Sequence, residues 1–423
     1  MKNGILIILL LISVAMIGMG TYSILNKSKP NQPNNEKPVV NPKTNDFNIN
    51  IIKEISKTEN KNFLISPYSI EIALSMLKEG SSGTTLSELE KVVPTRKISF
   101  LSIKDRISIA NALFIKNEYK SSVKKTFSDA LVSKYSSELL YDDFKDAKVI
   151  NNWVDQKTSG MIKKVVNDDE LSNMILALAN AIAIDVEWEN QFDCSSTKSD
   201  DFITQDGIKK VEMMTKTFSN YSNAKYIKTD NEVGILLPYK YYKSDGTSTK
   251  ESSSNTTNLE FIAVLPKNDI NTYINNLTND KLDGLFNSFT KPSEKEEVYL
   301  SIPRFEYDYD WQNFKDSLKN IGLKDAMGPN PDFTKIIDDV PVHIGKAVHK
   351  THISLNEKGT KAAAVTYFQL DRNSIIIEKD RIDIKFDKPF MYFIRDNKSS
   401  ELLFFGIVKE PNMWKGSTCS NEK

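Results

Sequence analysis

The sequence contains few of the residues that hold metals or form nucleophilic centres. Its two cysteines, Cys194 and Cys419, have no CxxC spacing and supply too few ligands for a zinc site. Its three histidines, His343, His349 and His352, lie within ten residues. On a strand, His349 and His352 would face opposite ways because their separation is odd. We therefore expect no metal site, while the two cysteines could pair or stay free.

An excess of charge of either sign is also missing. Lys and Arg together number 56, and so do Asp and Glu. A balanced chain has no overall field to attract nucleic acid or an acidic surface, so no nucleic-acid partner is expected. The sequence also lacks the Gly-x-Ser-x-Gly, His-Glu-x-x-His and phosphate-loop motifs. These absences predict a protein that is not an enzyme and uses no cofactor.

The N-terminal region consists of an apolar run followed by a polar tether. Residues 4–25 carry no charge, and the length of this run lies between those of a signal-peptide core and a membrane-spanning helix. We expect residues 1–26 to be an export signal, either removed or kept as a membrane anchor. Residues 27–45 are rich in Pro, Asn and Lys and predict a flexible linker. The protein should then be secreted or extracellular, or anchored at the cell surface.

Several segments have the pattern of buried helices and strands. Ser66 and Pro67 are residue types typical of a helix N-cap and first turn. Residues 107–115 and 176–184 are apolar enough for strands buried on both faces. Asn180 lies within the second strand, and a buried amide must find hydrogen-bond partners.

A stretch near the C-terminal end, residues 356–374, alternates in polarity. Every second residue from Thr360 to Leu370 is uncharged, whereas the other set begins with Lys361 and ends with Asp371. Such alternation suits a strand with one buried face. Three consecutive alanines favour a helix by propensity, so the residues alone leave both structures open.

Residues 357–360, Glu-Lys-Gly-Thr followed by small residues, resemble the hinge of the reactive-centre loop of serpins. Residues 382–390 and 402–411 resemble the two hydrophobic strands that follow this loop in the family. By this resemblance, residues 46–411 would form a serpin domain and residues 412–423 a C-terminal tail. The sequence resembles serpins of the inhibitory type, and the protein could be a prokaryotic member of the family.

The resemblance implies an α+β serpin fold, with a large, mainly antiparallel central sheet A, sheets B and C, surrounding helices and an exposed reactive-centre loop. In serpins a polar shutter lies beneath sheet A, and the breach is the top of the sheet, where the hinge enters. The matching residues here are the hinge residues Glu357, Gly359, Thr360, Ala362, Ala363, Ala364 and Thr366, the shutter residues Ser66, Ser69, Asn180 and His349, and the breach residue Trp188.

The region between Leu89 and Ile107 is short for a serpin and lacks a basic cluster. In some animal members this region carries a helix that binds glycosaminoglycans. Its shortness here argues against heparin-type activation.

The function implied by the resemblance is irreversible inhibition of a serine endopeptidase, or of a cysteine endopeptidase, by a suicide mechanism. The target cleaves the loop and becomes joined to it as an acyl-enzyme, and the cleaved loop then inserts into sheet A and traps this acyl-enzyme. Family spacing places the reactive bond at Asn373–Ser374, with Arg372 as the alternative residue at the cut. The inhibitor is expected to be a monomer.

A non-inhibitory serpin, acting as a secreted binding or surface protein, is the alternative. Non-inhibitory members tend to carry bulky or charged residues on the inward face of the hinge. Here the inward residues Thr360, Ala362, Ala364 and Thr366 are small and uncharged, which favours inhibition.

Overall fold

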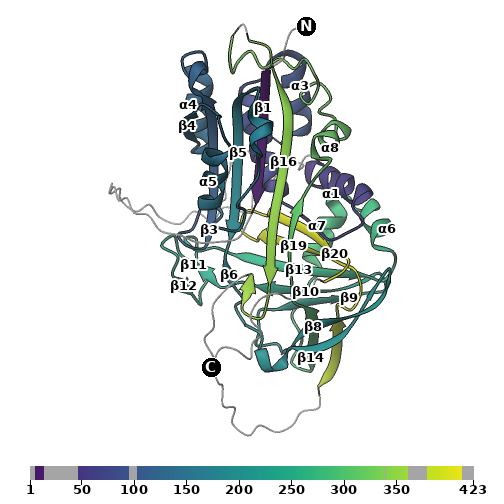
Figure 1. Ribbon diagram of the computed structural model, residues 1–423. Helices are drawn as coiled ribbons and strands as arrows, with labels where there is room; N and C mark the ends of the chain where they lie inside the picture. The colour runs from purple at the N-terminus through teal and green to yellow at the C-terminus, as the bar shows by residue number, and fades with distance from the viewer. Residues whose placement is uncertain (1–4, 14–45, 95–101, 339, 361–378, 412–423) are drawn as a thin grey trace, which may run out of the picture.

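The computed structural model describes residues 5–13, 46–94, 102–338, 340–360 and 379–411. Within these ranges three sheets are surrounded by helices (Figure 1), so the expected α+β class is confirmed. The helices are α1 (Phe47–Thr58), α2 (Pro67–Glu79), α3 (Gly83–Val92), α4 (Lys125–Tyr135), α5 (Lys148–Lys157), α6 (Ile270–Asn275), α7 (Asn279–Asn287) and α8 (Phe314–Asn320).

Sheet A is the tall sheet of Figure 1. Its strands, in spatial order, are β4 (Glu138–Asp142), β3 (Ile107–Lys116), β5 (Met174–Ile184), β1 (Ile5–Ser13), β16 (Val342–Leu355), β17 (Gly359–Thr360) and β6 (Val186–Glu187), and β15 (Phe305–Asp310) also pairs with β16. The apolar segments predicted as strands at 107–115 and 176–184 are β3 and β5. All residues of β5 are buried, because helices and neighbouring elements cover both faces of the sheet.

The central position of sheet A is occupied by β1. The strand runs parallel to both neighbours, with Leu11 opposite Asn180 on β5 and His349 on β16. The start of the apolar N-terminal run is therefore paired through its backbone with the two central strands. None of the helices within the described ranges is long and apolar enough to cross a membrane.

The short strand β17 lies in the same column as β1, at the lower end of sheet A in Figure 1. Thr360 pairs with Leu355 on β16 and with Val186 on β6, whereas Ser13 at the end of β1 pairs with Thr351 on β16. Only residues 352–354 of β16 separate the two pairings. A chain that continued along this column from Thr360 would therefore meet the end of β1.

Sheets B and C lie below sheet A in Figure 1. Sheet B has the order β2 (Phe63–Ile65), β20 (Glu401–Val408), β19 (Phe390–Asp396), β13 (Leu259–Pro266), β10 (Glu232–Pro238) and β9 (Lys225–Lys228). Sheet C has the order β18 (Asp380–Lys385), β14 (Glu296–Pro303), β8 (Gly207–Phe218) and β7 (Lys198–Thr204). A separate hairpin joins β11 (Tyr241–Tyr242) and β12 (Ser248–Thr249).

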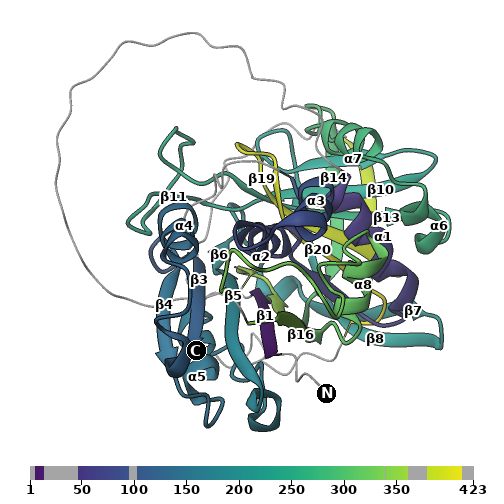
Figure 2. The same ribbon diagram turned by 90° about the horizontal axis from the view of Figure 1, so that it is seen from above.

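Helix α2 connects the sheets. Seen from above (Figure 2), it lies between β5 of sheet A and β20 of sheet B, and it contacts both strands. Ser66 is its N-cap, with its side chain accepting from the Ser69 N–H, and Pro67 begins its first turn. The predicted N-terminus is thus confirmed, and it places two serines beneath the centre of sheet A.

Candidate functional site

A cluster of buried polar side chains lies where α2 meets the centre of sheet A. The structure brings together the four residues assigned to the shutter, and each of them is completely buried: Ser66, Ser69, Asn180 and His349. The backbone N–H of Ser66 donates to Nε2 of His349 at 3.1 Å. The Ser69 hydroxyl donates to Oδ1 of Asn180. Each of the four residues therefore has a hydrogen-bond partner on another element, as burial favours.

These hydrogen bonds join the first turn of α2 to both strands that flank the central column. His349 is on β16 and Asn180 is on β5, so two serines one helical turn apart bond to opposite sides of β1. The bonds are formed while β1 lies between the two strands. A buried donor or acceptor left without its partner costs about 1–3 kcal/mol, so the cluster holds α2 against both strands when the column between them is filled.

The cluster extends to a residue that the sequence analysis did not identify. Nδ2 of Asn180 donates to Oδ1 of Asn111 on β3 at 2.7 Å, and Nδ2 of Asn111 donates to the Tyr135 carbonyl at 2.7 Å. Asn111 lies directly opposite Asn180 in the ladder. The sequence feature that could have identified Asn111 is that β3 and β5 are apolar strands with one amide side chain each.

A second set of contacts surrounds the start of the hinge, at the end of sheet A that carries β17 and β6. Trp188 donates through its indole Nε1 to the Asn356 carbonyl at 2.9 Å and through its backbone N–H to the Lys358 carbonyl at 2.8 Å. Its ring stacks on Tyr239 with centroids 4.6 Å apart. The Tyr239 hydroxyl in turn lies 2.8 Å from Oγ1 of Thr360. Burial raises the pKa of Tyr239, so the phenol stays neutral and can hydrogen-bond to the threonine.

Gly359 is required by the close approach of the hinge to β6. A Cβ atom at this position would lie 2.3 Å from the Val186 carbonyl oxygen and 2.7 Å from the Glu187 Cα. Its φ of 155° also lies in a region that side chains disfavour. The hinge therefore reaches the sheet edge only with glycine here.

Glu357 is held in a buried ion-pair network. Its Oε1 accepts from Nη1 of Arg304 at 3.3 Å and from Oγ1 of Thr197 at 2.6 Å. Arg304 also donates through Nε to Glu212 at 2.6 Å. The side chains of Arg304 and Glu357 are only 3% and 5% exposed, so removing one partner would leave a buried charge. Sequence analysis assigned no role to Arg304 or Thr197, because their partners are distant in the chain.

The remaining predicted site residues lie outside the described residues. They are the hinge residues Ala362, Ala363, Ala364 and Thr366 and the residues at the predicted cut, Arg372, Asn373 and Ser374.

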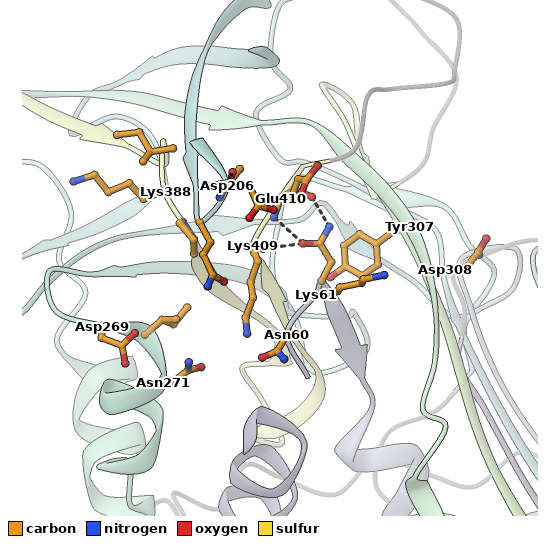
Figure 3. Close-up of a pocket in the computed structure, with 16 residues that line it drawn as sticks. Asn60, Lys61, Asp206, Asp269, Asn271, Tyr307, Asp308, Lys388, Lys409 and Glu410 are labelled. Atoms are coloured by element: carbon orange, nitrogen blue, oxygen red, sulfur yellow. Dashed lines mark hydrogen bonds between the residues drawn. The ribbon is translucent and has the colours of Figure 1, made fainter. Parts of the chain in front are cut away.

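A cavity of about 940 Å³ lies beside α6, the turn between β7 and β8, and the end of β20 (Figure 3). Asn62 bridges its wall by accepting from the N–H groups of Lys409 and Glu410 at 2.7 and 2.9 Å. Lys409 donates to the Glu59 carbonyl at 2.7 Å, and burial lowers the pKa of Lys409. These contacts of Asn62 and Lys409 hold the C-terminal end of β20 in place.

Comparison with known proteins identifies relatives along almost the whole chain. The family model described as Serpin (serine protease inhibitor) matches residues 42–411. An uncharacterized serpin-like protein of Thermococcus kodakarensis is 29% identical over 415 residues, covering 92% of this chain and 90% of the relative. The leukocyte elastase inhibitor of Sus scrofa is 28% identical, covering 83% and 93%. The native crystal structure of the thermophilic serpin tengpin has 30% identity and a TM-score of 0.72, covering 91% of this chain and 97% of its own.

Proposed function

The chain belongs to the serpin family, and from that premise we propose that it is an irreversible suicide-substrate inhibitor of serine or cysteine endopeptidases. Serpins are generally protease inhibitors rather than enzymes. The observation that carries the proposal is the position of the hinge: Thr360 is paired with β16 on one side and β6 on the other. The loop that follows thus starts inside the column into which an inhibitory serpin inserts its cleaved loop.

The chemistry of trapping begins at the reactive bond. The nucleophile of the target protease attacks the carbonyl carbon of Asn373, or of Arg372 if the cut lies one residue earlier. The peptide bond breaks, the new amine of the following residue leaves, and the loop remains attached to the protease as an acyl-enzyme. Insertion of the loop then moves the attached enzyme before water can hydrolyse the ester of a serine protease or the thioester of a cysteine protease.

The length of the loop suits this movement. From Thr360 to Asn373 are fourteen residues, and β16, along which they would pair, also has 14 residues. At roughly 3.3 Å per residue the inserted segment would span about 46 Å. The protease would be dragged along the length of sheet A and distorted, so that its oxyanion hole no longer supports deacylation.

The position of β1 adds a condition to this mechanism. Because β1 fills the column between β5 and β16 that continues from Thr360, the loop can insert only after residues 5–13 have left the sheet. Removal of the N-terminal segment during export, or its retention in a membrane, would each vacate the column. We therefore propose that the inhibitor acts as an exported monomer, free or anchored at the cell surface.

The test is to mix the full chain, and the chain shortened to begin at Lys27, with trypsin, chymotrypsin, elastase, subtilisin and an asparaginyl protease. A complex that survives denaturing electrophoresis is expected with at least one protease. The mass of the released C-terminal peptide then gives the reactive bond. Clean cleavage of the loop by several proteases without any complex would instead favour the alternative, a non-inhibitory serpin that acts as a binding or surface protein.

A further inference from the structure

The segment between α5 and β5, residues 158–173, crosses one face of sheet A. Residues 161–164 line a cavity of about 400 Å³ together with residues 308–310 of β15 and residues 350–351 of β16. The chain then enters β5 at Met174. Because β1 lies between β5 and β16, and β15 pairs with the far edge of β16, the segment has to pass over β16 and β1. We call residues 158–173 the cover.

The cover is firmly attached on the β5 side of the column. It contributes apolar side chains to a buried cluster with α5, β3 and β5, namely Ile162, Val165, Val166 and Leu171. Asn151 of α5 adds hydrogen bonds, since its Oδ1 accepts from the N–H groups of Val165 and Val166 at 2.8 and 3.2 Å and its Nδ2 donates to the Val166 carbonyl at 3.0 Å. This side of the cover is therefore anchored by packing as well as by hydrogen bonds.

Two lysines of β16 attach the cover on the other side of the column. Lys346 forms an ion pair with Glu170, and Nζ of Lys350 donates to the Lys164 carbonyl at 3.3 Å. Lys350 is also engaged in an ion pair with Asp310 of β15. The pair of Lys346 with Glu170 is therefore the contact in which opposite charges join β16 to the cover.

Glu170 is positioned for this ion pair by its own turn. Its Oε2 accepts from the Asn167 N–H at 2.8 Å, which completes the capping box of the short helix Asp168–Leu171. Partial burial acts against ionisation, but the bonds to Lys346 and Asn167 outweigh it and lower the pKa of Glu170. The carboxylate is thus charged at neutral pH. The side chains of Lys346 and Glu170 are 39% and 22% exposed, so salt can screen their attraction.

We propose that the cover retains β1 in the column between β5 and β16, and that the ion pair of Lys346 with Glu170 is the contact that breaks when β1 is released. Lys346 lies opposite Ile8 of β1, and Ile8 lies opposite Ala177 of β5. The ion pair therefore attaches the cover at a level where β1 is paired on both edges. Helix α2 contacts β1 as well, and it packs on the face of β5 opposite the cover.

This enclosure leaves two ways out for β1. Withdrawal along the column would break the ladder hydrogen bonds on both edges together. Lifting of the cover from β16 would let them break one after another, which has the lower barrier. The cover is thus a salt-sensitive gate on the N-terminal strand.

The consequence of this gate for inhibition rests on the proposed function, because release of β1 opens the column to the cleaved loop. Retention of β1 by the cover does not rest on it. The test therefore follows β1 itself and uses no protease. Failure of the protease experiment above would leave the gate unaffected, and failure of the gate would leave inhibition unaffected.

The experiment measures hydrogen exchange in the full chain by mass spectrometry, on peptides that cover residues 5–13 and, as an internal reference, β13 of sheet B. Lys346→Met removes the charge and keeps a side chain of similar length. Glu170→Gln removes the opposite charge and keeps an acceptor for the Asn167 N–H. The double variant completes a mutant cycle, and every protein is measured at low and at high salt.

Lys134→Met is the matched control. Lys134 forms an ion pair with Glu79, whose side chain is 21% exposed, close to the exposure of Glu170. This ion pair joins α4 to α2 and does not involve the cover. Exchange in β1 should therefore be the same in Lys134→Met as in the wild type.

Each single variant at the gate should exchange residues 5–13 roughly two- to fivefold faster than the wild type, as expected for a partly exposed ion pair. The double variant should be no faster than the faster single variant, because both substitutions remove the same contact. High salt should accelerate exchange in the wild type but not in the double variant. Exchange in β13 should stay constant throughout.

Unchanged exchange of β1 in both single variants would overturn the proposal. So would an equal acceleration in β1 and β13, which would show a general loss of stability instead of an opened gate. Wild-type β1 amides that exchange at the rate of an unprotected chain would show that the cover retains nothing.

Discussion

Thr360 is the single residue on which the proposed insertion most depends. Its side chain is buried, with 2% exposure, and it shares a hydrogen bond with Tyr239. The site next to the stacked rings of Trp188 and Tyr239 accommodates a small side chain with a hydroxyl group. A long charged side chain would have to be buried without a counter-charge, which is strongly unfavourable.

We expect Thr360→Arg to convert the inhibitor into a substrate. The loop should still be cleaved, but insertion should be too slow to trap the acyl-enzyme, so the complex on denaturing gels should fall by about tenfold or more. Lys361→Arg is the matched control, because the alternating pattern predicts that Lys361 faces outward. Undiminished trapping by Thr360→Arg would contradict the insertion mechanism.

His349 allows a similar test of the cluster beneath the sheet. His349→Ala removes the acceptor for the Ser66 N–H and leaves a cavity beside Trp311 and Phe314. We expect the free energy of unfolding to fall by about 2–5 kcal/mol and spontaneous inactivation on heating to accelerate.

The matched control on the same strand is His352→Ala, which removes a contact to Asp308, a residue whose side chain is 80% exposed. A surface ion pair contributes at most about 1 kcal/mol. Equal effects of the two substitutions, measured by urea unfolding and by heat inactivation, would argue against a special role for His349 in joining α2 to sheet A.

At the scale of elements, the sequence predicted local patterns well and pairings poorly. The N-cap at Ser66 and the strands β3 and β5 follow from residue type and periodicity, which act over a few neighbours. The contact of Arg304 with Glu357 joins residues far apart in the chain, and periodicity does not encode such pairs. The shutter residues were found together because a family resemblance, rather than propensity, supplied their long-range arrangement.

Strand β1 shows this limit most clearly. An uncharged run of this length suits an export segment, and its apolar residues equally suit a buried central strand. Local chemistry does not distinguish the two environments. The choice depends on whether the run meets a membrane or the gap between β5 and β16. The composition of the run carries no information about which of the two it meets.

Deletion of residues 1–26 should therefore make loop insertion easier. We expect the shortened chain to form more covalent protease complex than the full chain, because without residues 5–13 the column between β5 and β16 is open to the loop. Adding a synthetic peptide of residues 5–13 should suppress the complex again by refilling the column. The control peptide carries Leu9→Pro, since proline lacks the N–H needed for the ladder. Equal trapping by the full and shortened chains, with no effect of the peptide, would show that β1 does not block the loop.

At the scale of the whole molecule, the proposal requires that the intact form is not the most stable arrangement of the chain. The proposal holds that the uncleaved loop stays outside sheet A, whereas a cut loop can add a central strand and bury its small, uncharged face. The energy for displacing a protease would come from this difference, so it should be measurable without any protease complex.

Cleavage of the shortened chain in the loop should raise its unfolding temperature. If each new hydrogen bond contributes about 0.5–1 kcal/mol net, a strand of this length adds on the order of 10 kcal/mol. For a domain of this size that corresponds to a rise of roughly 10–15 °C. Scanning calorimetry before and after limited cleavage measures the shift, with Thr360→Arg cut at the same bond as the control. Because the variant can be cleaved but should not insert, its unfolding temperature should change little. A wild-type loop that is cut without any gain in stability would leave the molecule no energy with which to distort a protease.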